Sequence, residues 1–287
     1  MTIHYGMAQW QHTAWVNWLY PASLPSAERI ARYSQVFSTV EVGSTFYTKV
    51  DDAQLVRWYE SVSDGFKFSF KAPQAITHRL IERPWDDVQQ DWLAFMLSLQ
   101  PLQNKLGPTM LQFPAVCDSR ALEVILALCD MWTLSTPLSV EVRNLDYFDK
   151  AQIESIFLSS LAERNVNRVI MDSRPVFSTE AYCESLVDAQ KKKPRVPCHP
   201  VATANHPVIR FIGHPDLPRN DLWLDQWAVK LSQWLSDGLT PSVFVHSSDN
   251  IAAPTLAAQL DEKVSALLPD YRRVLDLPPS QEQTSLW

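Results

Sequence analysis

The sequence predicts an α/β fold, a single TIM-like (β/α)₈ barrel, from three observations. Eight short runs rich in β-branched or aromatic residues recur along the 287 residues, stretches with helical spacing separate them, and no linker divides the chain. A barrel of this type typically occupies about 250 residues. We therefore assign residues 1–275 to one barrel domain and 276–287 to a mobile, proline-led C-terminal tail. An open, doubly wound sheet is the alternative.

The expected strands follow one another at intervals that leave room for a helix. "IHYGMAQ" supplies the first strand at 3–9 and "STVEV" the second at 38–42. The other six are expected at 66–72, 109–113, 138–142, 168–172, 207–213 and 242–246. Between them, apolar residues recur with helical spacing, as at Trp92, Phe95 and Leu99. This alternation of strand and helix is typical of a barrel.

Composition excludes several classes of function. The formal net charge of −7 argues against a protein that coats nucleic acid through bulk charge. The four cysteines contain no CxxC pair, which leaves a zinc knuckle or a redox motif unsupported, and the six glycines form neither GxGxxG nor a P-loop. The N-terminus has no secretory signal, and no apolar stretch reaches the roughly 20 residues that span a bilayer. We therefore expect a cytoplasmic protein without a membrane partner.

Each expected strand carries a polar residue near its C-terminal end, where the loops of a barrel form its open concave face. In "VEVGS" and "VEVRN" a glutamate lies between two valines, so Glu41 and Glu141 point into the barrel if the valines face the helices. The candidate acids, bases or metal ligands are Glu41, Glu141 and Asp172. The candidate substrate-binding residues are Thr45, Tyr47, Lys71, His78, Gln112, Arg143, Arg174, Arg210 and His246.

Two interpretations fit these charges. Either the surplus cations of an active site bind a phosphate or carboxylate group, or the charges form a structural ion-pair network that fills the top of the barrel. A divalent metal stays open as a cofactor, because the carboxylates and His246 could supply ligands although no HxH or HExxH motif fixes a ligand set. The basic run at 191–195 is interpreted as a solvated loop, with a flexible lid that presents charge to a phosphate-bearing or nucleic-acid ligand as the alternative.

The motifs "VEVGSTFY", "FKFSFKAPQAITH", "LQFP", "VEVRN", "VIMDSRPV" and "IRFIG", in this order, resemble the YecE-like family, the domain of unknown function 72. The stretch at 172–201 and the ending "SLW" further resemble the YecE branch of that family. The resemblance implies a TIM-like barrel of unknown activity, and its recurrent polar positions agree with the strand-end candidates. The chain departs from many relatives at Gly43, at Asn144 and over 244–250, so a substrate common to the whole family does not follow.

Three functions follow as hypotheses. The first is an enzyme, a hydrolase, lyase or isomerase, that acts on a small anionic substrate at the strand ends. The second comes from the tail: "QTSLW", with Gln283, Leu286 and Trp287 as anchors, resembles the peptide by which bacterial DNA polymerases and repair proteins bind the sliding clamp. Such a motif would bring the barrel to DNA. The third is a ligand-binding barrel without turnover.

Overall fold

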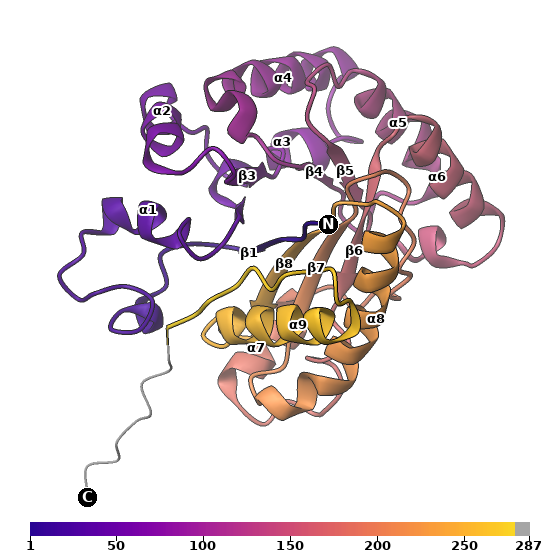
Figure 1. Ribbon diagram of the computed structural model, residues 1–287. Helices are drawn as coiled ribbons and strands as arrows, with labels where there is room; N and C mark the ends of the chain where they lie inside the picture. The colour runs from indigo at the N-terminus through magenta and orange to yellow at the C-terminus, as the bar shows by residue number, and fades with distance from the viewer. Residues whose placement is uncertain (279–287) are drawn as a thin grey trace, which may run out of the picture.

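The computed structural model describes residues 1–278 and has a mixed α/β fold built on parallel strands (Figure 1). Six strands form one curled parallel sheet in the order β1-β8-β7-β6-β5-β4, and β2 pairs with β3 in a second, parallel pair. The strands are β1 (His4–Met7), β2 (Thr39–Val42), β3 (Lys67–Phe70), β4 (Thr109–Gln112), β5 (Leu138–Glu141), β6 (Asn167–Asp172), β7 (Val208–Gly213) and β8 (Ser242–Ser247). Each coincides with an expected run, so the positions of the strands are confirmed.

Helices lie on the outside of the strands (Figure 1). They are α1 (Arg29–Tyr33), α2 (Asp52–Ser61), α3 (Gln74–Thr77), α4 (Trp85–Ser98), α5 (Leu122–Asp130), α6 (Gln152–Glu163), α7 (Glu184–Lys192), α8 (Asp221–Ser236) and α9 (Ala253–Leu267). Short 3₁₀ helices add η1 (Thr13–Trp15), η2 (Ser26–Glu28), η3 (Ser44–Phe46), η4 (Gln100–Lys105), η5 (Ser119–Ala121), η6 (Leu145–Phe148) and η7 (Leu217–Asn220). Helix α4 illustrates why they form: Asp86 and Asp87 favour its N-terminal turn, and Val88, Trp92 and Phe95 bury one face.

The structure shows only part of the closed eight-stranded barrel that the sequence predicts. The six-stranded sheet is a curled half-barrel, and the hydrogen-bonded ladder is interrupted between β1 and β2 and between β3 and β4. β1 still lies beside β2, and β3 beside β4. Two isolated bridges, Phe68 with Leu106 and Lys71 with Met110, join the β3 side to the β4 side.

A tyrosine hydroxyl replaces ladder hydrogen bonds where β1 meets β2. The Tyr33 hydroxyl accepts the N–H of Met7 at 2.7 Å and donates to the carbonyl oxygen of Thr39 at 3.0 Å. The backbones approach closely here, because a Cβ on Gly6 would lie 2.1 Å from the same carbonyl oxygen. These buried backbone groups are therefore satisfied by a side chain instead of by the neighbouring strand.

A second side chain joins β3 to the segment before β4. The Ser69 hydroxyl donates to the carbonyl oxygen of Pro108. Proline has no N–H, so it cannot donate to a ladder at this position. At both interruptions a polar side chain, Tyr33 or Ser69, pairs with backbone groups, and hydrophobic periodicity does not predict such bonds.

The interior of the curled sheet is layered. Met110, Val169, Val208 and Phe244 form a small buried apolar cluster. Side chains alternate along a strand with a period of two, so the residues two positions further on face the same interior. These are Gln112, Met171, Arg210 and His246. A layer that is polar except for Met171 thus lies above an apolar one, toward the C-terminal ends of the strands.

The described part of the expected tail, 276–278, contacts the folded domain. Leu277 packs against the main core, and the Trp18 indole donates to the carbonyl oxygen of Pro278 at 3.0 Å. Within residues 1–278, no helix combines the length and the apolar character needed to cross a membrane.

Candidate functional site

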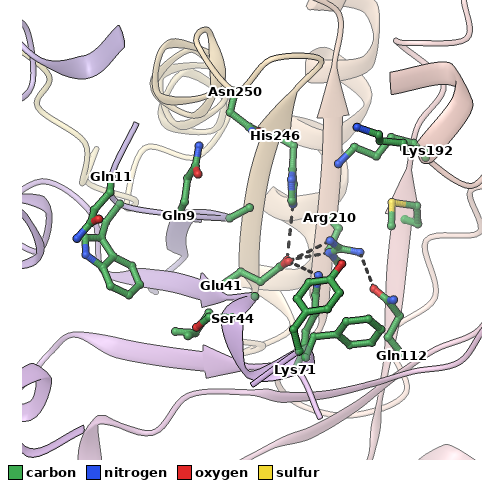
Figure 2. A pocket seen from close by; sticks show the side chains of 18 of the residues that line it. Gln9, Gln11, Glu41, Ser44, Lys71, Gln112, Lys192, Arg210, His246 and Asn250 are labelled. Atoms are coloured by element: carbon green, nitrogen blue, oxygen red, sulfur yellow. Dashed lines mark hydrogen bonds and ion pairs between the residues drawn. The ribbon is translucent and has the colours of Figure 1, made fainter. Parts of the chain in front are cut away.

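A cavity of about 970 Å³ opens at the C-terminal ends of the strands (Figure 2). Five strands direct polar side chains into it or to its base. These side chains are Glu41 from β2, Lys71 directly after β3, Gln112 from β4, Arg210 from β7 and His246 from β8. These five side chains therefore lie together at the strand ends, and their roles stay predictions.

Arg210 forms the centre of an ion cluster at the base of the cavity (Figure 2). Its Nε lies 2.8 Å from Oε2 of Glu41, and its Nη2 lies 3.0 Å from Oε1 of the same carboxylate. Its Nη1 donates to Oε2 of Glu141 at 2.7 Å and lies 3.5 Å from the Gln112 amide oxygen. All three guanidinium nitrogens of Arg210 are engaged by protein groups.

Lys71 and Arg143 complete the cluster. Lys71 Nζ lies 2.6 Å from Oε1 of Glu41, and Arg143 Nε lies 2.9 Å from Oε1 of Glu141. Both glutamates are only 1% exposed, and buried charges need such partners to avoid a cost of several kcal/mol. Three cations facing two carboxylates leave the cluster with one net positive charge.

The cations keep both glutamates ionised. Burial raises the pKa of Glu141, but Arg210, Arg143 and Lys71 outweigh it and lower that pKa to about 2. Burial likewise opposes ionisation of Glu41, whose pKa the Arg210 and Lys71 charges hold well below the usual range. Carboxylates this acidic accept protons poorly near neutral pH. Their arrangement suits them to holding the cations in place.

His246 faces this cluster as a neutral imidazole. Its Nε2 lies 3.6 Å from Oε2 of Glu41, too far for a hydrogen bond, and no residue in 1–278 satisfies this buried atom. Burial lowers the pKa of His246 to about 4, although the Glu41 charge opposes this shift.

Two lysines from the basic run at 191–195 also line the cavity. Lys192 is exposed and pairs with Asp188 at 2.7 Å, as expected for a solvated segment. Lys193 is half-buried, so the interpretation as a solvated loop is wrong for this residue. Burial and the nearby Arg210 charge lower the pKa of Lys193 to about 8.

An aromatic wall borders the cations. Trp10 and Trp58 meet edge to face with ring centroids 5.1 Å apart, and both line the cavity. Phe46 packs against the His78 ring at 4.8 Å, and Tyr47 at the rim is 74% exposed. The cavity thus offers apolar ring surface beside positive charge.

Comparison with known proteins places the chain in a family. The model for "Protein of unknown function DUF72" matches residues 4–282. The chain belongs to the DUF72 family. UPF0759 protein YecE from Escherichia coli (strain K12) is 36% identical over 285 residues, which cover 99% of this chain and 100% of the relative. The protein of the same name from Escherichia coli O157:H7 is also 36% identical over the same shares.

Solved structures of DUF72 proteins share the fold. A DUF72 family protein from Thermotoga maritima MSB8 superimposes with a TM-score of 0.67 at 19% identity, covering 92% of this chain and 100% of its own. One from Enterococcus faecalis V583 gives a TM-score of 0.68 at 17% identity, covering 94% and 98%. Likeness at this level of identity concerns the fold alone.

The DUF72 fold brings most of the candidate residues together. Those that line the cavity are Glu41, Tyr47, Lys71, His78, Gln112, Arg143, Arg210 and His246. Glu141 lies beneath it in the ion cluster. Thr45 lies beside it, where its hydroxyl lies 2.8 Å from the Lys71 carbonyl oxygen and 3.2 Å from that of Val42. Thr45 therefore positions the backbone of Lys71.

Asp172 and Arg174 form a separate pair outside the cavity lining. The Asp172 carboxylate accepts hydrogen bonds from Arg174 Nε and Nη2, each at 2.8 Å, and from the Trp227 indole at 2.8 Å. Arg174 also lies over the Trp223 ring, 4.5 Å from its centroid. The catalytic role of Asp172 and the substrate-binding role of Arg174 stay predictions. Their position outside the cavity lining does not favour these roles.

Sequence interpretation did not single out Lys193 or Trp58 for the site. The sequence feature that could have indicated Lys193 is its place in the basic run. Its position at the end of α7, which brings it to the cavity lining, is seen only in the structure. Gln283, Leu286 and Trp287 lie outside the described residues.

The described residues offer no preformed metal ligand set. Within 1–278 there is no group of three or more His, Cys, Asp or Glu side chains arranged to hold an ion. Both oxygens of Glu41 and of Glu141 are already engaged by cations.

Proposed function

We propose that the cavity binds a small anionic compound through a phosphate or carboxylate group. The observation that carries this proposal is the charge of the cavity lining, in which five cationic side chains accompany one carboxylate, Glu41. The cations are Lys71, Arg143, Lys192, Lys193 and Arg210. This local surplus stands out in a chain with a net charge of −7.

Arg143 is the residue best placed to bind the anion. Its Nε is oriented by Glu141, whereas its Nη1 and Nη2 donate to no residue within 1–278. The side chain is 23% exposed and lines the cavity. A guanidinium held at one nitrogen with two free donors matches the planar, bidentate recognition of carboxylate or phosphate.

The ion cluster beneath supports this role. Glu41 and Glu141 hold Arg210, Lys71 and Arg143 in fixed positions before any ligand arrives, so little side-chain entropy is lost on binding. The Trp10 and Trp58 rings provide apolar surface for the rest of the ligand. In this function the two glutamates orient the cations. Whether the bound compound is then converted separates an enzyme from a ligand-binding barrel.

A thermal-shift and calorimetric titration with inorganic phosphate, malonate and 3-phosphoglycerate tests the proposal. A ligand at a hundredfold its Kd stabilises by about 2.7 kcal/mol, which is worth about 2 to 4 °C in a chain of this size. We expect the shift to disappear in Arg143→Gln and to persist in Arg164→Gln, a matched change at a half-buried arginine that pairs with Asp130 and lies outside the cavity lining. No shift with any of these anions, or an equal shift in Arg143→Gln, contradicts the proposal.

We also propose that the segment 283–287 binds the bacterial sliding clamp. The observation behind it is the sequence "QTSLW", whose apolar Leu286 and Trp287 suit a hydrophobic groove. Capture of the full chain by purified clamp should be lost in a Leu286→Ala, Trp287→Ala variant and kept in Gln281→Ala. Equal capture of the parent and the double variant would contradict this second function.

A further inference from the structure

The three lysines that line the cavity differ in their partners. Lys71 pairs with Glu41 at 2.6 Å, and Lys192 pairs with Asp188 at 2.7 Å. Within residues 1–278, Lys193 Nζ forms neither a salt bridge nor a hydrogen bond with a protein group, although the side chain is half-buried. Lys193 is therefore the lysine of this cavity whose amine is free to meet a ligand.

The backbone around Lys193 is fixed on both sides. Its N–H closes the last turn of α7 by donating to the Ala189 carbonyl oxygen at 2.8 Å. The carbonyl oxygen of the next residue, Pro194, accepts the Ser173 hydroxyl at 2.8 Å, and Val196 is buried in a local apolar cluster. The scaffold thus fixes the backbone from which the Lys193 side chain reaches the cavity lining.

The surroundings favour the uncharged amine. Burial disfavours the ammonium form, and the Arg210, Lys71 and Arg143 charges add to this effect, while Glu41 opposes it. With a pKa of about 8, roughly a tenth of the amine is unprotonated at pH 7, against roughly 0.03% for an ordinary lysine. An unprotonated amine is the nucleophilic form.

We propose that Lys193 forms an imine with an anionic aldehyde or ketone bound in the cavity. This inference rests on the proposed anion site, because Arg143 would hold the phosphate or carboxylate group while Lys193 meets the carbonyl carbon. The cavity has room for a substrate of this kind, and its cations also polarise a carbonyl oxygen. The substrate class is thereby narrowed from anions in general to anionic carbonyl compounds.

The covalent step balances without an added oxidant or reductant. The nitrogen lone pair attacks the carbonyl carbon, the π electrons move to oxygen, and a proton passes from nitrogen to oxygen to give a carbinolamine. The hydroxyl then leaves as water with one further proton, and the nitrogen lone pair forms the protonated imine. The Lys71 ammonium, which also lines the cavity, is the group that we assign to donate this proton and regain it from water.

Reductive trapping tests the inference on the full chain. The protein is incubated at pH 7 with glyoxylate and cyanoborohydride, and the modified lysines are located by peptide mass spectrometry. Glyceraldehyde 3-phosphate replaces glyoxylate in a second arm, to distinguish phosphate from carboxylate. Acetaldehyde and glyceraldehyde are the neutral counterparts of the two probes. Lys191→Met, at an exposed lysine outside the cavity lining, and Arg143→Gln accompany the parent protein, and thermal unfolding confirms that each variant is folded.

We expect at least one anionic probe to modify Lys193 at least about tenfold faster than any other lysine. The neutral counterpart of that probe should not show this preference. The preference should persist in Lys191→Met and disappear in Arg143→Gln. Modification of Lys193 no faster than of exposed lysines overturns the inference. Because labelling in the parent protein gives the answer, folding of a Lys193 variant is not required.

The failure of this inference differs from the failure of the proposed function. If phosphate or malonate binds through Arg143 but Lys193 is not trapped, the imine is wrong and the anion site stands. If no anion binds and acetaldehyde labels Lys193 as fast as glyoxylate, both are wrong.

Discussion

Arg210 on β7 binds Glu41 on β2 through two parallel hydrogen bonds, Nε to Oε2 at 2.8 Å and Nη2 to Oε1 at 3.0 Å. The two residues are 169 positions apart in sequence and belong to different sheets. The pair therefore links the six-stranded sheet to the β2–β3 pair across the interior of the molecule. It also joins the stability of the fold to the geometry of the cavity.

Replacing Arg210 should be strongly destabilising. Arg210→Ala leaves two buried carboxylates short of a partner, and we expect a loss of about 3 to 5 kcal/mol in the free energy of unfolding. Arg210→Lys keeps the charge but cannot form the forked contact, so we expect it to recover only part of that loss. Urea denaturation measures both. Arg164→Ala, at an exposed pair, should cost at most about 1 kcal/mol, and an equal loss in both alanine variants would contradict a central role for Arg210.

His246 should make stability depend on pH in the acid range. Burial lowers its pKa from 6.5 to about 4, so between these values the unfolded chain binds more protons than the folded one. Stability from this residue is fully present above pH 6.5 and is lost as the pH falls toward 4, by about 3 kcal/mol in all.

The test of that dependence compares the parent protein with His246→Asn. Free energies of unfolding at a series of pH values should fall less steeply for the variant between pH 6.5 and 4. Other histidines with a lowered pKa, such as His4, remain in both proteins and cancel in the difference. Parallel profiles would show that His246 is not held neutral.

The Tyr33 hydroxyl should contribute measurably to the contact between β1 and β2. Tyr33→Phe leaves the buried N–H of Met7 without its acceptor, and we expect a loss of about 1 to 3 kcal/mol. Tyr182→Phe removes a hydroxyl from a side chain that is 62% exposed and should change stability by less than about 0.5 kcal/mol. If urea denaturation gives the same loss of stability for both variants, the contact between β1 and β2 does not depend on the Tyr33 hydroxyl.

Asp172 should act on stability and not on ligand binding. Asp172→Asn weakens its contacts with Arg174 and Trp227, and we expect a loss of about 2 kcal/mol. Affinity for phosphate or malonate should stay within about twofold of the parent value. A fall in affinity as large as that in Arg143→Gln would return Asp172 to the functional site.

Periodicity predicted the strands and part of the site for a clear physical reason. A strand buried on both faces gives a short apolar run, so a polar residue inside it is conspicuous, as Glu41 and Glu141 are. The same reasoning was insufficient for Asp172. Val169 and Met171 face the interior, which turns Asp172, one residue later, toward the Trp227 indole of α8. A shift of one residue changes the face, and the sequence of β6 does not fix which face is inside.

The closed barrel was predicted only in part, since strand closure depends on how neighbouring backbones meet. Tyr33 and Ser69 each satisfy backbone groups that a continuous ladder would have paired. Such bonds join residues that hydrophobic patterning treats as unrelated.

The sequence alone determined the order of strands and helices, the absence of nucleotide-binding glycine loops, and the presence of charges inside apolar runs. These features are local, because they follow from residue type and spacing over a few positions. The tertiary structure decided which charges meet. Curling of the sheet brings Arg210 to Glu41 and Glu141, and the packing of α7 directs Lys193 into the cavity. Contacts between distant segments depend on sheet register and helix placement, which no short stretch of sequence specifies.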